Sequence, residues 1–191
     1  MTDDDTPIAE FLDAIASEQV APAGGTAAAI TGATGAALCE MVCVHTIAAS
    51  DDGAADELSE LRSGLRRRRE TLLALGAQDA GLVDDLFGDD EEASIRLQRR
   101  AAGIPLAVSE AAASVLTDAE TAHRRGRSGV AADAKTGAYL ADAAVRASLE
   151  TVRINAAALP DRSFAADLES RARAVKEAVR DARPRLFGGD G

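Results

Sequence analysis

Apolar residues recur every three to four positions along most of the chain, and no stretch alternates strictly between apolar and polar residues. Such spacing gathers apolar side chains on one face of a helix, so the pattern predicts an all-α protein. Turn signals divide the pattern into six predicted helices, at about residues 7–15, 25–49, 54–87, 91–125, 131–158 and 163–183.

Prolines mark the expected starts, ends and interruptions of these helices. Thr6 is expected to cap the first helix, with Pro7 at its first position. Pro105 predicts a kink in the fourth helix, and Pro184 is expected to end the sixth. Because the connections are short, we expect a single helical domain over residues 1–191, frayed at 1–5 and 185–191.

Composition predicts a protein that associates with itself. The 191 residues are 47% hydrophobic, but only 3% are aromatic and there is no Trp. The core must therefore consist of Ala, Leu, Val and Ile, and alanine removes little apolar area from water. A chain of this kind gains stability by burying further surface against a second copy, so we expect a homo-oligomer.

The net charge of -11 and the presence of only two lysines, Lys135 and Lys176, resemble adaptation to a salt-rich cytoplasm. The same charge disfavours nucleic-acid binding. No apolar run of 18 residues is free of charge or breakers, and acidic residues follow Met1, so neither a membrane anchor nor a secretory signal is expected. We therefore expect a cytoplasmic protein.

The segment APAGGTAAAITGATGAALCEMV, residues 21–42, predicts an unusually thin helix. Its small residues are explained either by close approach of a neighbouring helix or by a backbone that comes near a ligand. The entry Pro22-Ala23-Gly24-Gly25-Thr26 presents uncrowded N–H groups at the positive end of the helix, where anions and polar ligands bind readily. The two explanations are compatible.

Three polar residues stand in largely apolar surroundings. Asp79 lies either on a solvated helix face or partly buried, where a carboxylate can transfer protons. Asp133 begins a helix, so it is either an N-terminal charge or a functional group. Asn155 either bonds a backbone carbonyl at a helix terminus or contacts a ligand.

The remaining candidates have simpler explanations. Cys39 and Cys43 lie one helical turn apart, cannot form a disulfide without distorting the helix, and are expected to be core residues. His123 is expected to be exposed. The arginine clusters lack interleaved aromatic residues and are expected to be solvated faces rather than a nucleic-acid surface.

Together, several segments resemble the cyclodeaminase/cyclohydrolase family, which comprises the cyclodeaminase part of formiminotransferase-cyclodeaminase and stand-alone methenyltetrahydrofolate cyclohydrolases. They occur in the family's order and spacing from about Phe11 to Arg183. They are residues 21–42, the Asp79 segment, AAGIPLAVSEAAASVL, GRSGVAADAKTGAYLADAAVRASLETVRINAAALPD and the closing amphipathic helix. The chain departs from the family pattern at Ala23 and Thr26, where the family has Gly and Ser.

The resemblance implies an all-α homodimer with a folate site near the dimer interface. It implies no metal or redox cofactor, and the tetrahydrofolate derivative is the substrate. The implied catalytic residues are Asp79 and Asp133, and the implied substrate-binding residues are Pro22, Gly24, Gly25, Thr26 and Asn155.

The reaction implied is hydrolysis of 5,10-methenyltetrahydrofolate to 10-formyltetrahydrofolate, with a carboxylate as acid and base. One alternative is formiminotetrahydrofolate cyclodeaminase, which releases ammonia. Another is a non-catalytic dimeric bundle that retains the fold. The cyclohydrolase is preferred because no formiminotransferase segment is fused to this chain.

Overall fold

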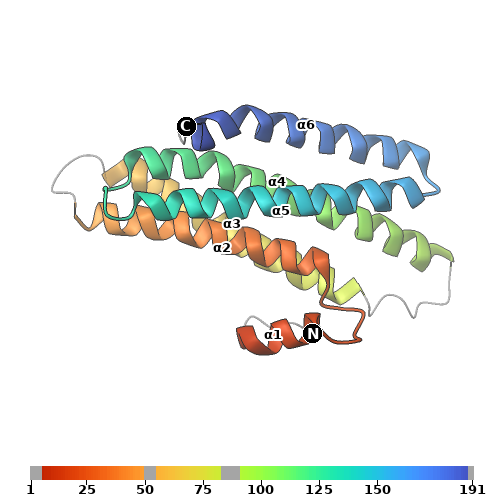
Figure 1. Ribbon diagram of the computed structural model, residues 1–191. Coiled ribbons are helices and arrows are strands. Elements are labelled where there is room, and N and C mark those ends of the chain that lie inside the picture. Colours follow the sequence, from red (N-terminus) through yellow and green to blue (C-terminus); the bar gives the residue numbers. More distant parts are fainter. Residues whose placement is uncertain (1–5, 50–54, 83–90, 189–191) are drawn as a thin grey trace.

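The computed structural model describes residues 6–49, 55–82 and 91–188, and within these ranges every regular element is helical. The all-α prediction is therefore confirmed. The helices are α1 (Ile8–Ile15), α2 (Gly24–Ile47), α3 (Ala55–Ala80), α4 (Glu91–Arg125), α5 (Ala131–Ala158) and α6 (Arg162–Phe187) (Figure 1).

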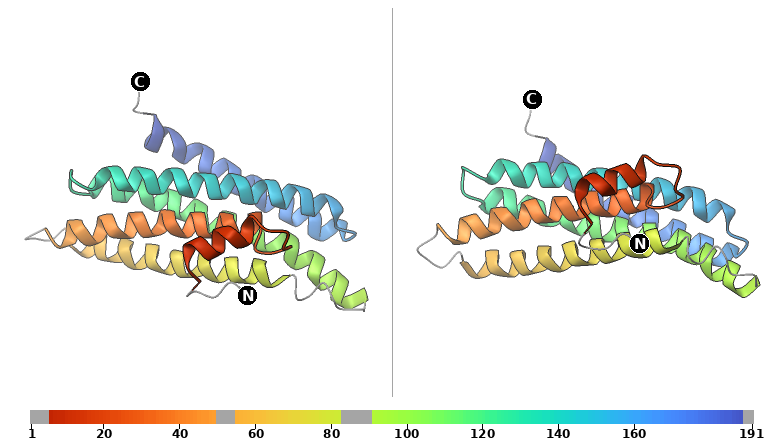
Figure 2. Two further views of the ribbon diagram at one scale, coloured as in Figure 1. Left: turned by 60° about the horizontal axis from the view of Figure 1, so that its bottom comes forward. Right: turned by 90° about the horizontal axis from the view of Figure 1, so that it is seen from below.

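Helices α2 to α5 form an up-and-down bundle, in which α2 packs against α3 and α5, and α4 packs against α3 and α5. Helix α6 lies along α4 and α5 on the side away from α3 (Figure 1). Helix α1 lies outside the bundle, beside the end at which α2 begins and α3 ends (Figure 2). The start of α2 is thus flanked by two further segments of the chain.

Close approach of α2 and α5 explains the small residues in the middle of α2. A Cβ atom added to Gly35 would lie 2.6 Å from the carbonyl oxygen of Gly137, so the two backbones are nearly in contact. Cys39 lies beside this contact, and both Cys39 and Cys43 are fully buried, which confirms them as core residues. Burial raises the pKa of Cys39 to about 12 and that of Cys43 to about 11, so both remain thiols.

Two prolines lie inside helices. Helix α4 continues through Pro105. Because proline has no N–H group, the carbonyl of Ala101 loses its helical donor. It accepts a hydrogen bond of 2.7 Å from the Asn155 amide instead. The expected end at Pro184 is wrong, because α6 continues to Phe187. Leu186 is buried there, and the Phe187 ring stacks on the Tyr139 ring with 4.4 Å between the ring centroids.

Some predicted boundaries shift. Thr6 does not cap α1, because Pro7 precedes the helix and no side chain caps it. Helix α3 ends at Ala80, and a single 3₁₀ turn covers Gly81 and Leu82. The expected end at Gly88-Asp89-Asp90 lies outside the described residues.

Helix α2 is long and apolar enough to cross a membrane by length and composition, which the sequence analysis did not anticipate. Half of its most apolar 18-residue window is buried inside the protein. Because α2 packs against three other helices of the bundle, its composition is that of a core helix.

Candidate active site at the start of α2

The carboxylate of Asp79 lies directly over the first turn of α2. The Thr26 hydroxyl donates a hydrogen bond of 2.8 Å to Asp79 Oδ2. A Cβ atom on Gly25 would lie 2.6 Å from the same oxygen, so only glycine leaves room for the carboxylate. Asp79 is half-buried here, which excludes the fully solvated helix face considered above.

The local conformation of the chain creates this position. Ala23 is extended, with φ -133° and ψ -160°, and α2 begins at Gly24 without any side-chain cap. The first N–H groups of a helix have no helical acceptor, and they lie at the positive end of its dipole. The start of α2 is therefore suited to an anion or a polar ligand, with the Asp79 carboxylate beside it.

A cleft of about 440 Å³ lies between the end of α3, the segment before α2, and α1. Pro22 and Ala80, the neighbour of Asp79, form part of its wall. The opposite wall is α1 and the segment that follows it, through Glu10, Phe11, Asp13, Ala14, Ser17 and Gln19. The volume lies within the range typical of small-molecule sites.

Asp133 does not share this site within one chain. It lies in the first turn of α5, next to Ala134, whose carbonyl oxygen is 3.8 Å from Cys39 Sγ. Cys39 and Thr26 are 13 positions apart on α2, or about 20 Å at 1.5 Å per residue. Within one chain, Asp79 and Asp133 therefore lie too far apart to act in the same pocket.

Asn155 lies towards the same end of the bundle as Thr26, but its amide group already has a partner. Its Nδ2 donates to the carbonyl oxygen of Ala101 inside α4. The carbonyl belongs to the middle of a helix rather than to a terminus, and it is free because of Pro105. The structure thus supports the backbone-partner alternative for Asn155.

The comparisons with known proteins identify the family of the chain. A family model described as formiminotransferase-cyclodeaminase matches residues 7–174. The chain belongs to the formiminotransferase-cyclodeaminase family. It is 35% identical over 175 residues to the methenyltetrahydrofolate cyclohydrolase of Methylorubrum extorquens, with 83% of each protein covered.

The fold is also that of a solved relative, the formiminotetrahydrofolate cyclodeaminase of Thermotoga maritima. The two structures superpose with a TM-score of 0.88, over 96% of this chain and 95% of the other, at 20% sequence identity. At this identity the likeness establishes the fold alone.

Two departures from the family's glycine entry have structural explanations. Ala23 has an extended backbone that any residue adopts, and its side chain is exposed. The Thr26 methyl group points towards α3, with Cγ2 3.9 Å from where a Cβ of Gly76 would lie. Both residues therefore fit without displacing the Thr26 hydroxyl from Asp79.

Other sequence-based expectations have mixed outcomes. The arginine clusters make ion pairs, including Arg68 with Asp118 and Arg69 with Glu40. His123, expected to be exposed, is half-buried, with Nδ1 2.9 Å from the Ala131 carbonyl oxygen. The contribution of α1 to the cleft was missed, because its short pattern shows that it is amphipathic but not which surface it covers.

Proposed function

We propose that this protein hydrolyses 5,10-methenyltetrahydrofolate to 10-formyltetrahydrofolate, with Asp79 as the acid and base. The observation that carries the proposal is the Asp79 carboxylate, held by Thr26 over the glycine entry of α2. The next residue, Ala80, lines an open cleft. The relative from Methylorubrum extorquens supports the choice of reaction.

The reaction requires a water molecule and one group that moves a proton. The carbon that bridges N5 and N10 of the substrate is an electrophilic amidinium carbon. Asp79 takes a proton from a water molecule while the oxygen of that water bonds to the bridging carbon. Asp79 then delivers the proton to N5 as the bond between the carbon and N5 breaks. The hydroxyl proton of the adduct leaves to solvent, so 10-formyltetrahydrofolate and one proton are formed.

The test is a spectrophotometric assay with 5,10-methenyltetrahydrofolate in high-salt buffer, chosen for the charge of -11. Replacing Asp79→Asn should reduce kcat by about 100-fold to 10,000-fold, with helix content unchanged. Asp167→Asn, an exposed carboxylate on α6 outside the cleft, is the matched control and should retain most of the activity. Full turnover by the Asp79 variant would refute the assignment.

Formiminotetrahydrofolate cyclodeaminase is the second candidate reaction, because the matching family model carries that activity in its description. The same carboxylate would serve ring closure with loss of ammonia. Ammonia release from formiminotetrahydrofolate, measured beside the first assay, distinguishes the two. A chain that neither turns over nor is thermally stabilised by either substrate would be a non-catalytic bundle.

The proposal includes a homodimer formed through the outer faces of α2 and α5. From residue 27 to 38 the outward positions of α2 are uncharged and not fully buried: Ala27, Ile30, Thr31, Thr34, Ala37 and Leu38. The hydroxyls of Thr31 and Thr34 already donate to backbone carbonyls one turn earlier in α2, so burying them in an interface leaves no hydroxyl without an acceptor. Tyr139 and Ile154 add exposed apolar surface on α5.

The size of this face is sufficient for a stable dimer. A 24-residue helix is about 36 Å long, and two adjacent helices are about 20 Å wide. Two copies would thus bury about 1,400 Å² in total, within the range of specific interfaces. Thr34→Arg should halve the mass measured by light scattering, whereas Thr71→Arg on the outer face of α3 should leave it unchanged.

Within this dimer, we propose that Asp133 serves the site of the other chain. If the two faces pack antiparallel, the end of the bundle where α5 begins lies over the end of the partner's bundle where α2 begins. Mixed dimers test this directly: Asp79→Asn and Asp133→Asn chains, each inactive alone, should regain up to about a quarter of the activity when mixed, because one site per heterodimer is intact. If confirmed heterodimers recover no activity, Asp133 does not serve the site that contains Asp79 of the partner chain.

A further inference from the structure

A groove of about 760 Å³ runs between α5 and α6, on residues that the candidate active site does not use. Its floor is apolar and consists of Val145, Leu149 and Val152 from α5 with Ala172 and Val179 from α6. Apolar concave surfaces of this size with a few convergent polar groups are typical of sites for small molecules.

The charge on the rim is opposite in sign to that of the whole chain. Three acidic residues line the groove, against six basic ones: Arg146, Arg153, Arg173, Lys176, Arg180 and Arg183. The chain as a whole carries -11, so this local excess of positive charge is unusual for the molecule. A charge excess beside an apolar floor favours a ligand that is both apolar and anionic.

Two of the cations are available to such a ligand. Arg173 and Lys176 form no ion pair or hydrogen bond with any residue in the described part of the chain, and both are exposed. They lie three positions apart on α6, so their side chains are neighbours on one face of the helix.

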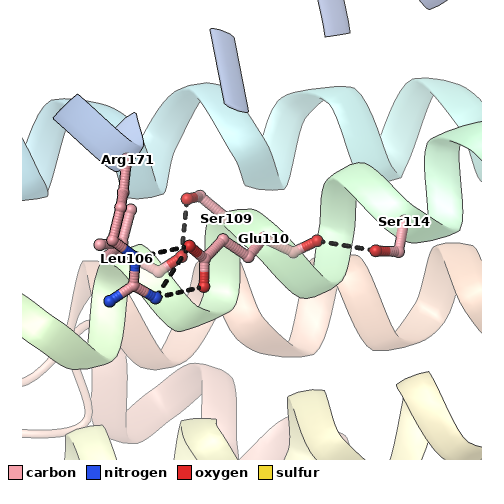
Figure 3. A network of polar contacts seen from close by, with 5 residues as sticks. All are labelled: Leu106, Ser109, Glu110, Ser114 and Arg171. Atoms are coloured by element: carbon pink, nitrogen blue, oxygen red, sulfur yellow. Dashed lines mark hydrogen bonds and ion pairs between the residues drawn. The ribbon is translucent and has the colours of Figure 1, made fainter. Parts of the chain in front are cut away.

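The walls of the groove are fixed by ion pairs. In the first half of α6, Arg171 donates to both carboxylate oxygens of Glu110 on α4 (Figure 3). Near its end, Arg183 donates to both oxygens of Asp142 on α5. Arg146 shares the Asp142 carboxylate, so two guanidinium groups face one negative charge and positive charge remains on the wall.

We propose that this groove binds a small amphipathic organic anion, a carboxylate or sulfonate with an aromatic or aliphatic body. The body lies on Val145, Leu149 and Val179, and the anionic group lies between Arg173 and Lys176. A small anion suits the groove better than a nucleic acid does, because a polyanion is repelled by the net charge of the chain, and the floor carries no aromatic ring for bases to stack on.

Fluorescence titration with 1-anilinonaphthalene-8-sulfonate tests the proposal, and N-phenyl-1-naphthylamine serves as a neutral probe with the same ring system. The full-length protein should bind one sulfonate per chain, more tightly than the neutral probe. The variant Arg173→Glu/Lys176→Glu should bind the sulfonate on the order of tenfold more weakly. The control Arg67→Glu/Arg124→Glu has the same change in charge on exposed arginines outside the groove and should bind it normally.

Arg173→Gln/Lys176→Gln provides a milder variant, which should lose part of the affinity while its circular dichroism stays unchanged. Equal affinity for both probes, or equal sulfonate binding by the groove and control variants, would overturn the proposal. A change in oligomeric mass on charge reversal, without sulfonate binding by the unaltered protein, would also overturn it and make the groove a contact between copies. None of these readouts depends on folate chemistry.

Discussion

Gly25 and Gly35 lie on the same helix and are equally crowded, but their neighbours differ in kind. The Cβ that Gly25 lacks would collide with the carboxylate of Asp79, a side chain with a polar function. The Cβ that Gly35 lacks would collide with the carbonyl oxygen of Gly137, a part of the backbone. One glycine makes room for the carboxylate that we propose as the acid and base, and the other makes room for a neighbouring helix.

The difference shows that a run of small residues in a sequence does not by itself distinguish close helix packing from room for a functional side chain. A side chain can turn away from an added methyl group, whereas the backbone of a packed helix moves only with the whole helix. Substitutions at the two glycines should therefore separate activity from stability.

The largest expected effect is on activity at Gly25. Gly25→Ala should displace the Asp79 carboxylate and lower turnover by about 100-fold or more, while the melting temperature changes little. Steady-state kinetics with thermal denaturation measures both quantities. Gly103→Ala in α4, outside the candidate site, is the control, because nothing lies within 4 Å of its added Cβ. Unchanged kinetics for Gly25→Ala would contradict the role of this contact.

Gly35 should show the reverse result. Gly35→Ala should destabilise the fold by about 1–3 kcal/mol through overpacking, which lowers the melting temperature by about 2–4 °C per kcal/mol. Gly103→Ala in α4 is the matched control, since open space surrounds its Cβ and alanine favours helix. A melting temperature as high as that of the unaltered protein would show that α2 and α5 can separate without cost.

Asn155 tests whether a residue near the site is there for packing or for substrate. Asn155→Ala should cost about 1–2 kcal/mol, because the Ala101 carbonyl loses its donor. In a Pro105→Ala background the N–H of residue 105 can satisfy that carbonyl, so the same change should cost less. Chemical denaturation of the four proteins gives the coupling. Equal costs in both backgrounds would remove the explanation, and a raised KM in both would indicate substrate contact.

The smallest effect is expected at Asp161, which caps α6 on the surface. Hydrogen bonds from Phe164 and Ser163, with the Arg99 guanidinium, lower the pKa of this carboxyl to about 2. Its contribution to stability is therefore present above the unfolded pKa near 4 and is lost as pH falls towards 2. Asp161→Asn should flatten this part of the acid-unfolding curve followed by circular dichroism. An unchanged curve would show that the cap does not hold α6.

Much of the fold could be predicted because helical periodicity is local. The bounds of α5 follow from its pattern, and the burial of Cys39 and Cys43 from their apolar surroundings. The end of α6 could not be predicted, because the burial of Leu186 and the stacking of Phe187 on Tyr139 outweigh the local effect of Pro184. In the candidate site, the sequence singled out the glycine entry and Asp79, but neither their contact nor the distant position of Asp133 could be predicted from it.

The sequence by itself determined that the chain is helical, that α2 is thin, and which polar residues interrupt apolar stretches. Those properties depend on residues within a few turns of one another. Only the tertiary structure decided which polar residues meet, because the antiparallel order of α2 and α5 brings Asn155 towards the start of α2 and carries Asp133 away from it. It also gave Asn155 its partner, since the carbonyl freed by Pro105 lies 54 positions away in sequence.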